Sequence, residues 1–332
     1  MRPPANKAFL TVADVEACVR CRVRLSYGPL PAYQAFRSKR LGRAMSGSAM
    51  QVEVRTEEAP PDDSPAVFDT EGAWYLQAEG DGYRISLRGG AREAPRLVAC
   101  ADVDTSHVTV YVGSNAGPAA DEGERRRRAP AGERGAQTLV NPMSYPLDQL
   151  LLMNHLASRG GVIVHAAGAV VNHRALLLAG ASGAGKSTIC RLLTDAGLGD
   201  SLLSDDRVIV RTAGGGRPAS NAASGSESGP GTAVAWGTPW AGEAMVARNA
   251  SAPVGALLFL VKADNNRLAR IGVAETLGRL TPLVSCPWYD AGRLGGVLDT
   301  CGRIAQQTPC YELHFRPDAG VVDLLATTPW GS

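Results

Sequence analysis

The stretch that decides the fold is Gly180-Ala-Ser-Gly-Ala-Gly-Lys-Ser187. The apolar run Ala175-Leu-Leu-Leu-Ala179 precedes it, as in a buried strand, and a helical pattern follows it and stops at Gly197. Its glycines let the backbone turn tightly, so that consecutive N–H groups point toward an anion. A strand, a glycine-rich loop and a helix in this order bind nucleotide phosphates. The sequence therefore predicts a nucleotide-binding α/β domain.

Each residue of the loop has an expected role. The predicted cofactor-binding residues are Gly180, Ala181, Ser182, Gly183, Ala184, Gly185, Lys186, Ser187 and Thr188. Lys186 is expected to reach the β- and γ-phosphates, and Ser187 to place its hydroxyl on Mg²⁺. Only four of the 34 basic residues are lysines, which fits a compact ammonium retained for this purpose. The expected cofactors are therefore ATP and Mg²⁺.

Two aspartates follow the next apolar run, Leu202-Leu-Ser-Asp205-Asp206. One helix and a short turn separate this run from the loop, so we expect a strand that returns directly beside the strand of the loop. Both carboxylates would then lie at the carboxyl edge of the sheet, where the phosphates bind. Neighbouring strand residues face opposite ways, so one aspartate would address the metal and the other the acceptor. The alternative is that they cap a strand end.

His165 lies between the apolar run Val162–Val164 and the small residues Ala166-Ala-Gly168. A single histidine in such surroundings is often a core residue whose hydrogen bonds are satisfied. Its place just before the strand of the loop makes a role near the γ-phosphate an equal alternative. From the sequence both interpretations stay open.

The chain divides into three parts. Residues 1–114 form a strand-rich N-terminal region of unknown role, with strand patterns at 19–25, 74–78, 83–87 and 107–112. Residues 115–137, with Arg125–Arg128, contain almost nothing apolar beyond Ala and predict a flexible linker or loop. Residues 138–332 alternate helix and strand and form the predicted nucleotide domain.

Three further segments carry predictions. Residues 40–65 are rich in Ser, Glu and Pro and are expected to be loop. The Gly- and Ser-rich stretch Gly214–Gly231 is expected to be a mobile loop that borders the γ-phosphate and closes over a peptide. Cys18 and Cys21 form a CxxC within a strand pattern, where their side chains would point to opposite faces. We therefore expect buried thiols and no zinc site.

The composition excludes several classes of protein. Of 332 residues, 45% are hydrophobic and 20% charged, which is typical of a globular chain. A net charge of +2 argues against a nucleic-acid partner. No apolar run approaches the roughly 18 residues of a membrane helix, and the first residues do not resemble a secretory signal. We expect a cytoplasmic protein with no membrane partner.

At this point the residues resemble a known group. Val-Ile-Val-His165-Ala-Ala-Gly, the glycine-rich loop and Leu-Leu-Ser-Asp205-Asp206-Arg-Val look like the HPr kinase/phosphorylase superfamily. Its nucleotide fold is shared with ATP-dependent phosphoenolpyruvate carboxykinase. The likeness covers about residues 145–330. Two further segments, Trp236–Glu243 and Tyr311–Asp318, look like the HPr-kinase-like proteins of peptide-tailoring gene clusters, some of which phosphorylate a precursor peptide on serine.

The resemblance implies a P-loop kinase that transfers the γ-phosphate of ATP to a hydroxyl, most simply a serine of a peptide or protein, and a possible homo-oligomer. Lys186 and His165 would belong to the catalytic set, with Asp206 as the base and Asp205 in support. The implied metal ligands are Ser187, Asp205 and Glu243. The chain departs from the family at Gly160, which stands where true HPr kinases have a histidine, and in lacking their Glu-Ile-Arg-Gly segment.

Two alternatives stay open. A related enzyme could phosphorylate a small hydroxylated metabolite or act like a carboxykinase. In a different class, the chain could be a nucleotide-dependent accessory module without phosphotransfer. The paired aspartates favour an enzyme, because a protein that only binds a nucleotide needs a single carboxylate for its metal.

Overall fold

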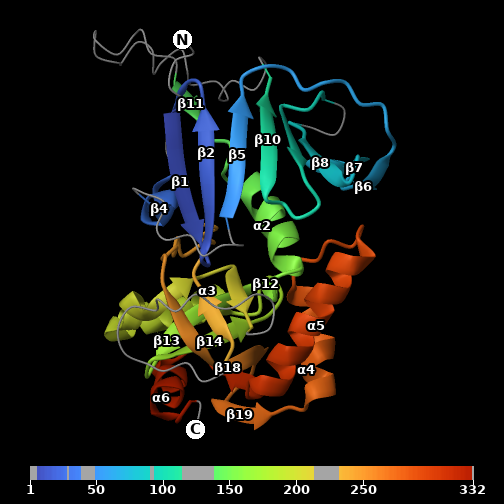
Figure 1. The fold of residues 1–332 in the computed structure, drawn as a ribbon. Coiled ribbons are helices and arrows are strands. Elements are labelled where there is room, and N and C mark those ends of the chain that lie inside the picture. Colours follow the sequence, from blue (N-terminus) through green and yellow to red (C-terminus); the bar gives the residue numbers. More distant parts are fainter. Residues whose placement is uncertain are drawn as a thin grey trace, which may run out of the picture. The chain divides into compact units, whose positions relative to one another are not determined.

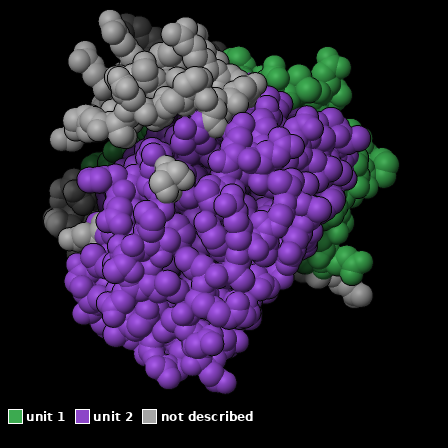
Figure 2. Space-filling view, turned by 90° about the horizontal axis from the view of Figure 1, so that it is seen from below, with its two compact units in different colours: residues 1–11, 15–31, 37–155 green, residues 12–14, 32–36, 156–332 purple. Residues whose placement is uncertain are grey.

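A computed structural model describes residues 6–27, 30–38, 49–89, 93–113, 138–212 and 232–330. The chain divides into two compact units, coloured separately in Figure 2. The first comprises residues 1–11, 15–31 and 37–155, and the second residues 12–14, 32–36 and 156–332. Residues 138–155 thus belong to the first unit, whereas the sequence analysis assigned them to the nucleotide domain at 138–332. The expected linker at 115–137 and the expected loop at 214–231 lie outside the described residues.

The elements up to the end of the first unit are mostly strands (Figure 1). They are β1 (Asn6–Val12), β2 (Val15–Cys21), β3 (Arg24–Ser26), η1 (Pro31–Phe36), β4 (Arg37–Ser38), β5 (Ala49–Arg55), β6 (Ala66–Asp69), β7 (Trp74–Glu79), β8 (Gly82–Leu87), β9 (Leu97–Ala101), β10 (His107–Val112), β11 (Thr138–Val140) and α2 (Leu147–Ala157). Within the described residues, nine strands form one sheet in the order β4-β1-β2-β5-β10-β9-β8-β7-β6. The strand-rich N-terminal region is confirmed.

Most of the predicted strands of this unit are present. The hairpin of β7 and β8 and the strand at His107–Val112 lie where the alternating patterns placed them. The prediction that residues 40–65 are all loop is wrong, because β5 lies at Ala49–Arg55 between β2 and β10. Its buried Met50, Val52 and Val54 alternate with polar residues, a period of two that the surrounding polar stretches obscured.

The second unit alternates strands and helices. Its elements are β12 (Gly161–Val164), β13 (Ala166–Val171), β14 (Arg174–Ala179), α3 (Lys186–Leu193), η2 (Thr194–Leu198), η3 (Gly199–Ser201), β15 (Leu202–Ser204), β16 (Val208–Arg211), β17 (Val234–Trp236), β18 (Ser251–Lys262), β19 (Arg267–Arg270), α4 (Val273–Leu280), η4 (Thr281–Leu283), α5 (Ala291–Gln307), β20 (Cys310–Phe315) and α6 (Ala319–Thr327). The described strands form a mixed sheet ordered β12-β16-β17-β18-β14-β13-β15, with β20 beside β18 and β19 beside β20. The expected α/β class is therefore observed.

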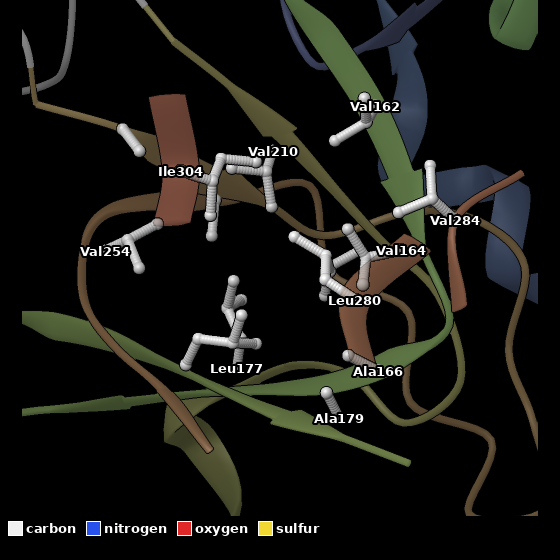
Figure 3. Close-up of a cluster of buried hydrophobic side chains, with 14 of the residues drawn as sticks. Val162, Val164, Ala166, Leu177, Ala179, Val210, Val254, Leu280, Val284 and Ile304 are labelled. Carbon is white, nitrogen blue, oxygen red and sulfur yellow. The ribbon is translucent and has the colours of Figure 1, made fainter. Parts of the chain in front are cut away.

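Two apolar clusters cover this sheet. One joins the sheet to α4 and α5 through Leu280, Val297 and Ile304, and Figure 3 shows part of it around Leu177. The other joins the sheet to α3 and α6, with Ile189 among its buried residues. Since both faces are covered, β14 is apolar and buried from Ala175 to Ala179, as strands between two helical layers are.

The hairpin of β13 and β14 positions the site. Asn172 and His173 form its two-residue turn with φ of 50° and 61°, the left-handed pair that suits the twist of a hairpin. The register pairs Val171 with Arg174 and Ala166 with Ala179. The residue before β13 and the residue after β14 therefore lie side by side at one edge of the sheet.

Candidate functional site

Three strands bring the predicted site residues to this edge. Strand β14 ends just before Gly180, and β13, which runs antiparallel to it, begins just after His165. On its other side β13 pairs antiparallel with β15, which ends just before Asp205. The prediction that the aspartate strand lies directly beside the strand of the loop is wrong, because the tight hairpin places β13 between them. Both outer strands run the same way, so loop and aspartates still share an edge.

The glycine-rich loop (residues 180–187) needs glycine at two positions. Gly183 and Gly185 have φ of 78° and 110°, a region that L side chains rarely adopt. A Cβ at Gly185 would also lie 2.5 Å from Cζ of Phe315, at the end of β20. Helix α3 then starts at Lys186 with no side chain capping its first turn, so its first N–H groups are available to an anion.

Lys186 turns back onto this loop. Its ammonium donates to the carbonyl oxygens of Gly180 at 2.7 Å and Ala181 at 3.2 Å, and only 7% of the residue is exposed. Burial lowers the pKa of Lys186, while the nearby Asp206 carboxylate opposes that shift. The ammonium is thus held where it could exchange carbonyl partners for phosphate oxygens.

Asp206 lies between two cationic or potentially cationic side chains. Nε2 of His165 is 3.0 Å from one carboxylate oxygen, and the guanidinium of Arg207 binds the other. All three side chains are partly buried. Burial, and then the charge of Lys186, lower the pKa of His165, whereas Asp206 acts to raise it. The cluster brings Lys186, His165, Asp206 and Arg207 into electrostatic contact, which distinguishes a site from isolated surface charges.

Asp205 directly follows β15, and its carboxylate is bound by a different part of the chain from that of Asp206. It is 2% exposed, and its carboxylate accepts the backbone N–H groups of Gly242 at 2.9 Å, Ala244 at 2.6 Å and Val246 at 3.2 Å. These bonds involve both of its oxygens. Asp205 therefore anchors the segment around Glu243, and its expected role as a metal ligand stays a prediction.

The remaining predicted residues lie around this centre. Ser187 and Thr188 are half-buried on the first turn of α3, and Ala181, Ser182 and Gly183 are exposed on the loop. Glu243 is exposed between two of the amides that bind Asp205. In the described part of the chain, no group of three or more His, Cys, Asp or Glu side chains is placed to hold a metal ion.

Two residues of the site were not predicted from the sequence. They are Arg207, whose side chain binds Asp206, and Thr238, which binds the backbone of Arg207. Thr238 is fully buried, and its hydroxyl donates to the carbonyl oxygen of Arg207 at 2.6 Å. The signal for Arg207 was available, because a charged residue directly follows the two aspartates. The signal for Thr238 was not, since its role depends on contacts between segments distant in sequence.

The first unit carries a polar groove of its own. It lies over β2, β5 and β10, has a volume of about 1090 Å³, and is lined by Arg20, Arg22, Glu53, Arg55 and His107 among others. Cys18 and Cys21 lie in β2 as buried free thiols, which confirms the prediction of buried cysteines.

No protein-family model matches the sequence, and no curated protein matches it. None of the helices in the described residues is long and apolar enough to cross a membrane.

Proposed function

We propose that the chain is a Mg²⁺-dependent kinase that transfers the γ-phosphate of ATP to a hydroxyl, in the first place a serine of a peptide or protein. The observation that carries the proposal is the buried Lys186 ammonium inside a glycine-rich loop, in electrostatic contact with the His165–Asp206 pair. Phosphoryl transfer needs a cation at the phosphates and a group that accepts the hydroxyl proton. A P-loop kinase fold is part of the proposal.

The loop would bind the phosphates. Its N–H groups and those of the first turn of α3 would donate to the phosphate oxygens, while Lys186 would contact the β- and γ-phosphates. The positive φ of Gly183 and Gly185 supports this role, because such a backbone can direct successive amides into one concavity.

Asp206 is the proposed base, which would accept the proton of the acceptor hydroxyl. Its two oxygens are held by His165 and Arg207, so the carboxylate has a fixed orientation. His165 has a lowered pKa, which favours the neutral imidazole at pH 7, and a neutral ring can still donate one N–H to Asp206. His165 and Arg207 are therefore positioning residues in this mechanism.

A magnesium ion is part of the proposal. The Ser187 hydroxyl on the first turn of α3 and the exposed Glu243 carboxylate are hard oxygen donors, which Mg²⁺ prefers together with phosphate oxygens and water. These two residues would hold the ion, and Asp205 would anchor the segment that carries Glu243. The ion would supply neutralisation of the charge that develops on the phosphoryl oxygens.

The test is mass spectrometry of acceptors incubated with Mg·ATP and the full-length chain. The acceptors are short serine peptides, including any encoded beside the gene, and a set of hydroxylated metabolites. Phosphate on a peptide serine that is lost with Asp206→Asn supports the proposal. Phosphorylation of metabolites alone would favour the small-molecule kinase or carboxykinase-like alternative. Binding of ATP without transfer to any acceptor would favour the accessory module.

A further inference from the structure

The segment Ala241–Ala247, which we call the Asp205 loop, is unusually well fixed for an exposed turn. Three alternate amides, of Gly242, Ala244 and Val246, donate to the one buried carboxylate of Asp205. Hydrogen bonds to a charged acceptor are stronger than those between neutral groups. The loop is therefore held in one conformation from its inner side.

Contacts with β15 fix the same loop at its end. The N–H of Arg248 donates to the carbonyl oxygen of Leu203 at 3.0 Å, and Ala247 forms an antiparallel bridge with Ser204. At its start, a Cβ on Gly242 would lie 2.9 Å from Cβ of Asp206. The loop is thus packed directly against the proposed base.

Met245 is the unusual residue of this loop. Its φ of 55° lies in the left-handed region, where a long side chain is disfavoured, and 67% of the residue is exposed. Its N–H donates to the carbonyl oxygen of Gly242 at 3.2 Å, which closes the turn. Glycine would adopt this backbone conformation without strain. The Met245 side chain does not offset the strain by packing into the core, because most of its surface is exposed. Strain of this kind is a reason to look for a function.

We infer that Met245 is a specificity residue that contacts the acceptor next to the phosphorylated hydroxyl. This inference rests on the proposed kinase function. A flexible thioether packs against apolar groups of varied shape, and a loop fixed in advance loses little entropy when it binds. The matching acceptor is a peptide segment with a large apolar side chain close to its serine. A small polar metabolite has no group that this surface would recognise.

The experiment is a positional-scanning library of serine decapeptides, phosphorylated with Mg·ATP by the wild type, Met245→Gly and Leu298→Ala. Leu298 is an exposed apolar residue of α5 and controls for loss of surface apolar area. The wild type and Leu298→Ala should prefer a large apolar residue near the serine. In Met245→Gly, the ratio of phosphorylation rates for peptides with and without that apolar residue should fall about tenfold. This variant removes the positive-φ strain, so its melting temperature should not fall.

A second measurement separates binding from chemistry. The preferred peptide, labelled with fluorescein, is titrated against the Lys186→Ala protein with and without Met245→Gly, and anisotropy reports the dissociation constant. A rise of about tenfold on removal of Met245 supports the inference. Phosphate transfer with unchanged peptide preference in Met245→Gly would overturn the inference alone. Failure of the wild type to phosphorylate any peptide would overturn the proposed function as well.

Discussion

The two sheets use their charged side chains in different ways. In the groove of the first unit, Arg55 pairs with Glu53 on the same strand, and His107 pairs with Asp102 while 77% exposed. At the edge of the second sheet, the charged groups are partly or largely buried and converge from three strands. Exposed pairs contribute about 0–1 kcal/mol each, whereas desolvated groups that converge have altered pKa values and can do chemistry. Burial and convergence therefore separate a candidate site from a charged surface.

The largest expected effect comes from removing the cation of the site. Lys186→Ala should lower ATP turnover by about 10²–10³-fold, because charge stabilisation at the phosphates is lost. Lys7→Ala, in the exposed part of β1, is the matched control and should leave turnover unchanged. A coupled ADP assay measures the rates, and thermal unfolding shows that both variants are folded. Wild-type turnover by Lys186→Ala would mean that the loop is not the phosphate site.

Two glycines with positive φ should differ in how much their substitution destabilises the protein. Gly185→Ala combines an unfavourable φ with a clash against the buried ring of Phe315, so a loss of about 2–4 kcal/mol is expected. Gly80, in the turn between β7 and β8, has a φ of 56° and open space around its Cβ position. Gly80→Ala should cost about 1 kcal/mol. Urea denaturation measures both, and equal losses would contradict the predicted clash.

Asp205→Asn tests whether a buried carboxylate is structural. The amide keeps one acceptor oxygen and places an N–H₂ group toward a backbone donor, so a loss of about 1–3 kcal/mol is expected. Glu53→Gln, at an exposed position of β5, should change stability by less than about 0.5 kcal/mol. Both unfolding free energies come from urea denaturation. A stable Asp205→Asn protein with a raised Mg²⁺ requirement would support the predicted role of Asp205 as a metal ligand.

The smallest expected effect is a titration. Burial and Lys186 lower the pKa of His165, so its NMR titration should have a midpoint below the ordinary value of about 6.5. Lys186→Ala should raise that midpoint, and Asp206→Asn should lower it further. Because the folded-state pKa is lowered, the contribution of His165 to stability is present above about pH 6.5 and is lost as the pH falls through the folded value. If the titration midpoint of His165 is the same in the wild type and in both variants, His165 does not interact with Lys186 or Asp206.

The fold was predictable where apolar residues recur along the chain with the period of a strand or a helix. The strands β7, β8, β10 and β14 lie close to their predicted positions, since β10 buries every second residue and Ala175–Ala179 is a continuous apolar run. The strand β5 was missed because its alternation is short and lies between polar stretches. Strand order was not predictable from the spacing of the loop and the aspartates, because a hairpin inserts β13 between two strands that a helix connects.

The sequence indicated which residues lie together at the site, but not what each of them contacts. Lys186, His165 and Asp206 are brought together as the motifs and strand ends suggested. The different fates of Asp205 and Asp206 could not be assigned, since they depend on a segment about forty residues later that supplies backbone amides. Local sequence shows two adjacent carboxylates, but only the packed structure determines which one is buried.

The hairpin of β13 and β14 also sets an order of assembly. Its turn brings His165 to the start of the glycine-rich loop by a local step, and hairpins form in about 1–10 μs. Asp206 joins later, after α3 has packed and β15 has paired with β13, and this step has a longer loop to close. His165 and the start of the glycine-rich loop are therefore expected to meet before Asp206 reaches them. Under the proposed function, the partner that orients the base would be in place before the base itself.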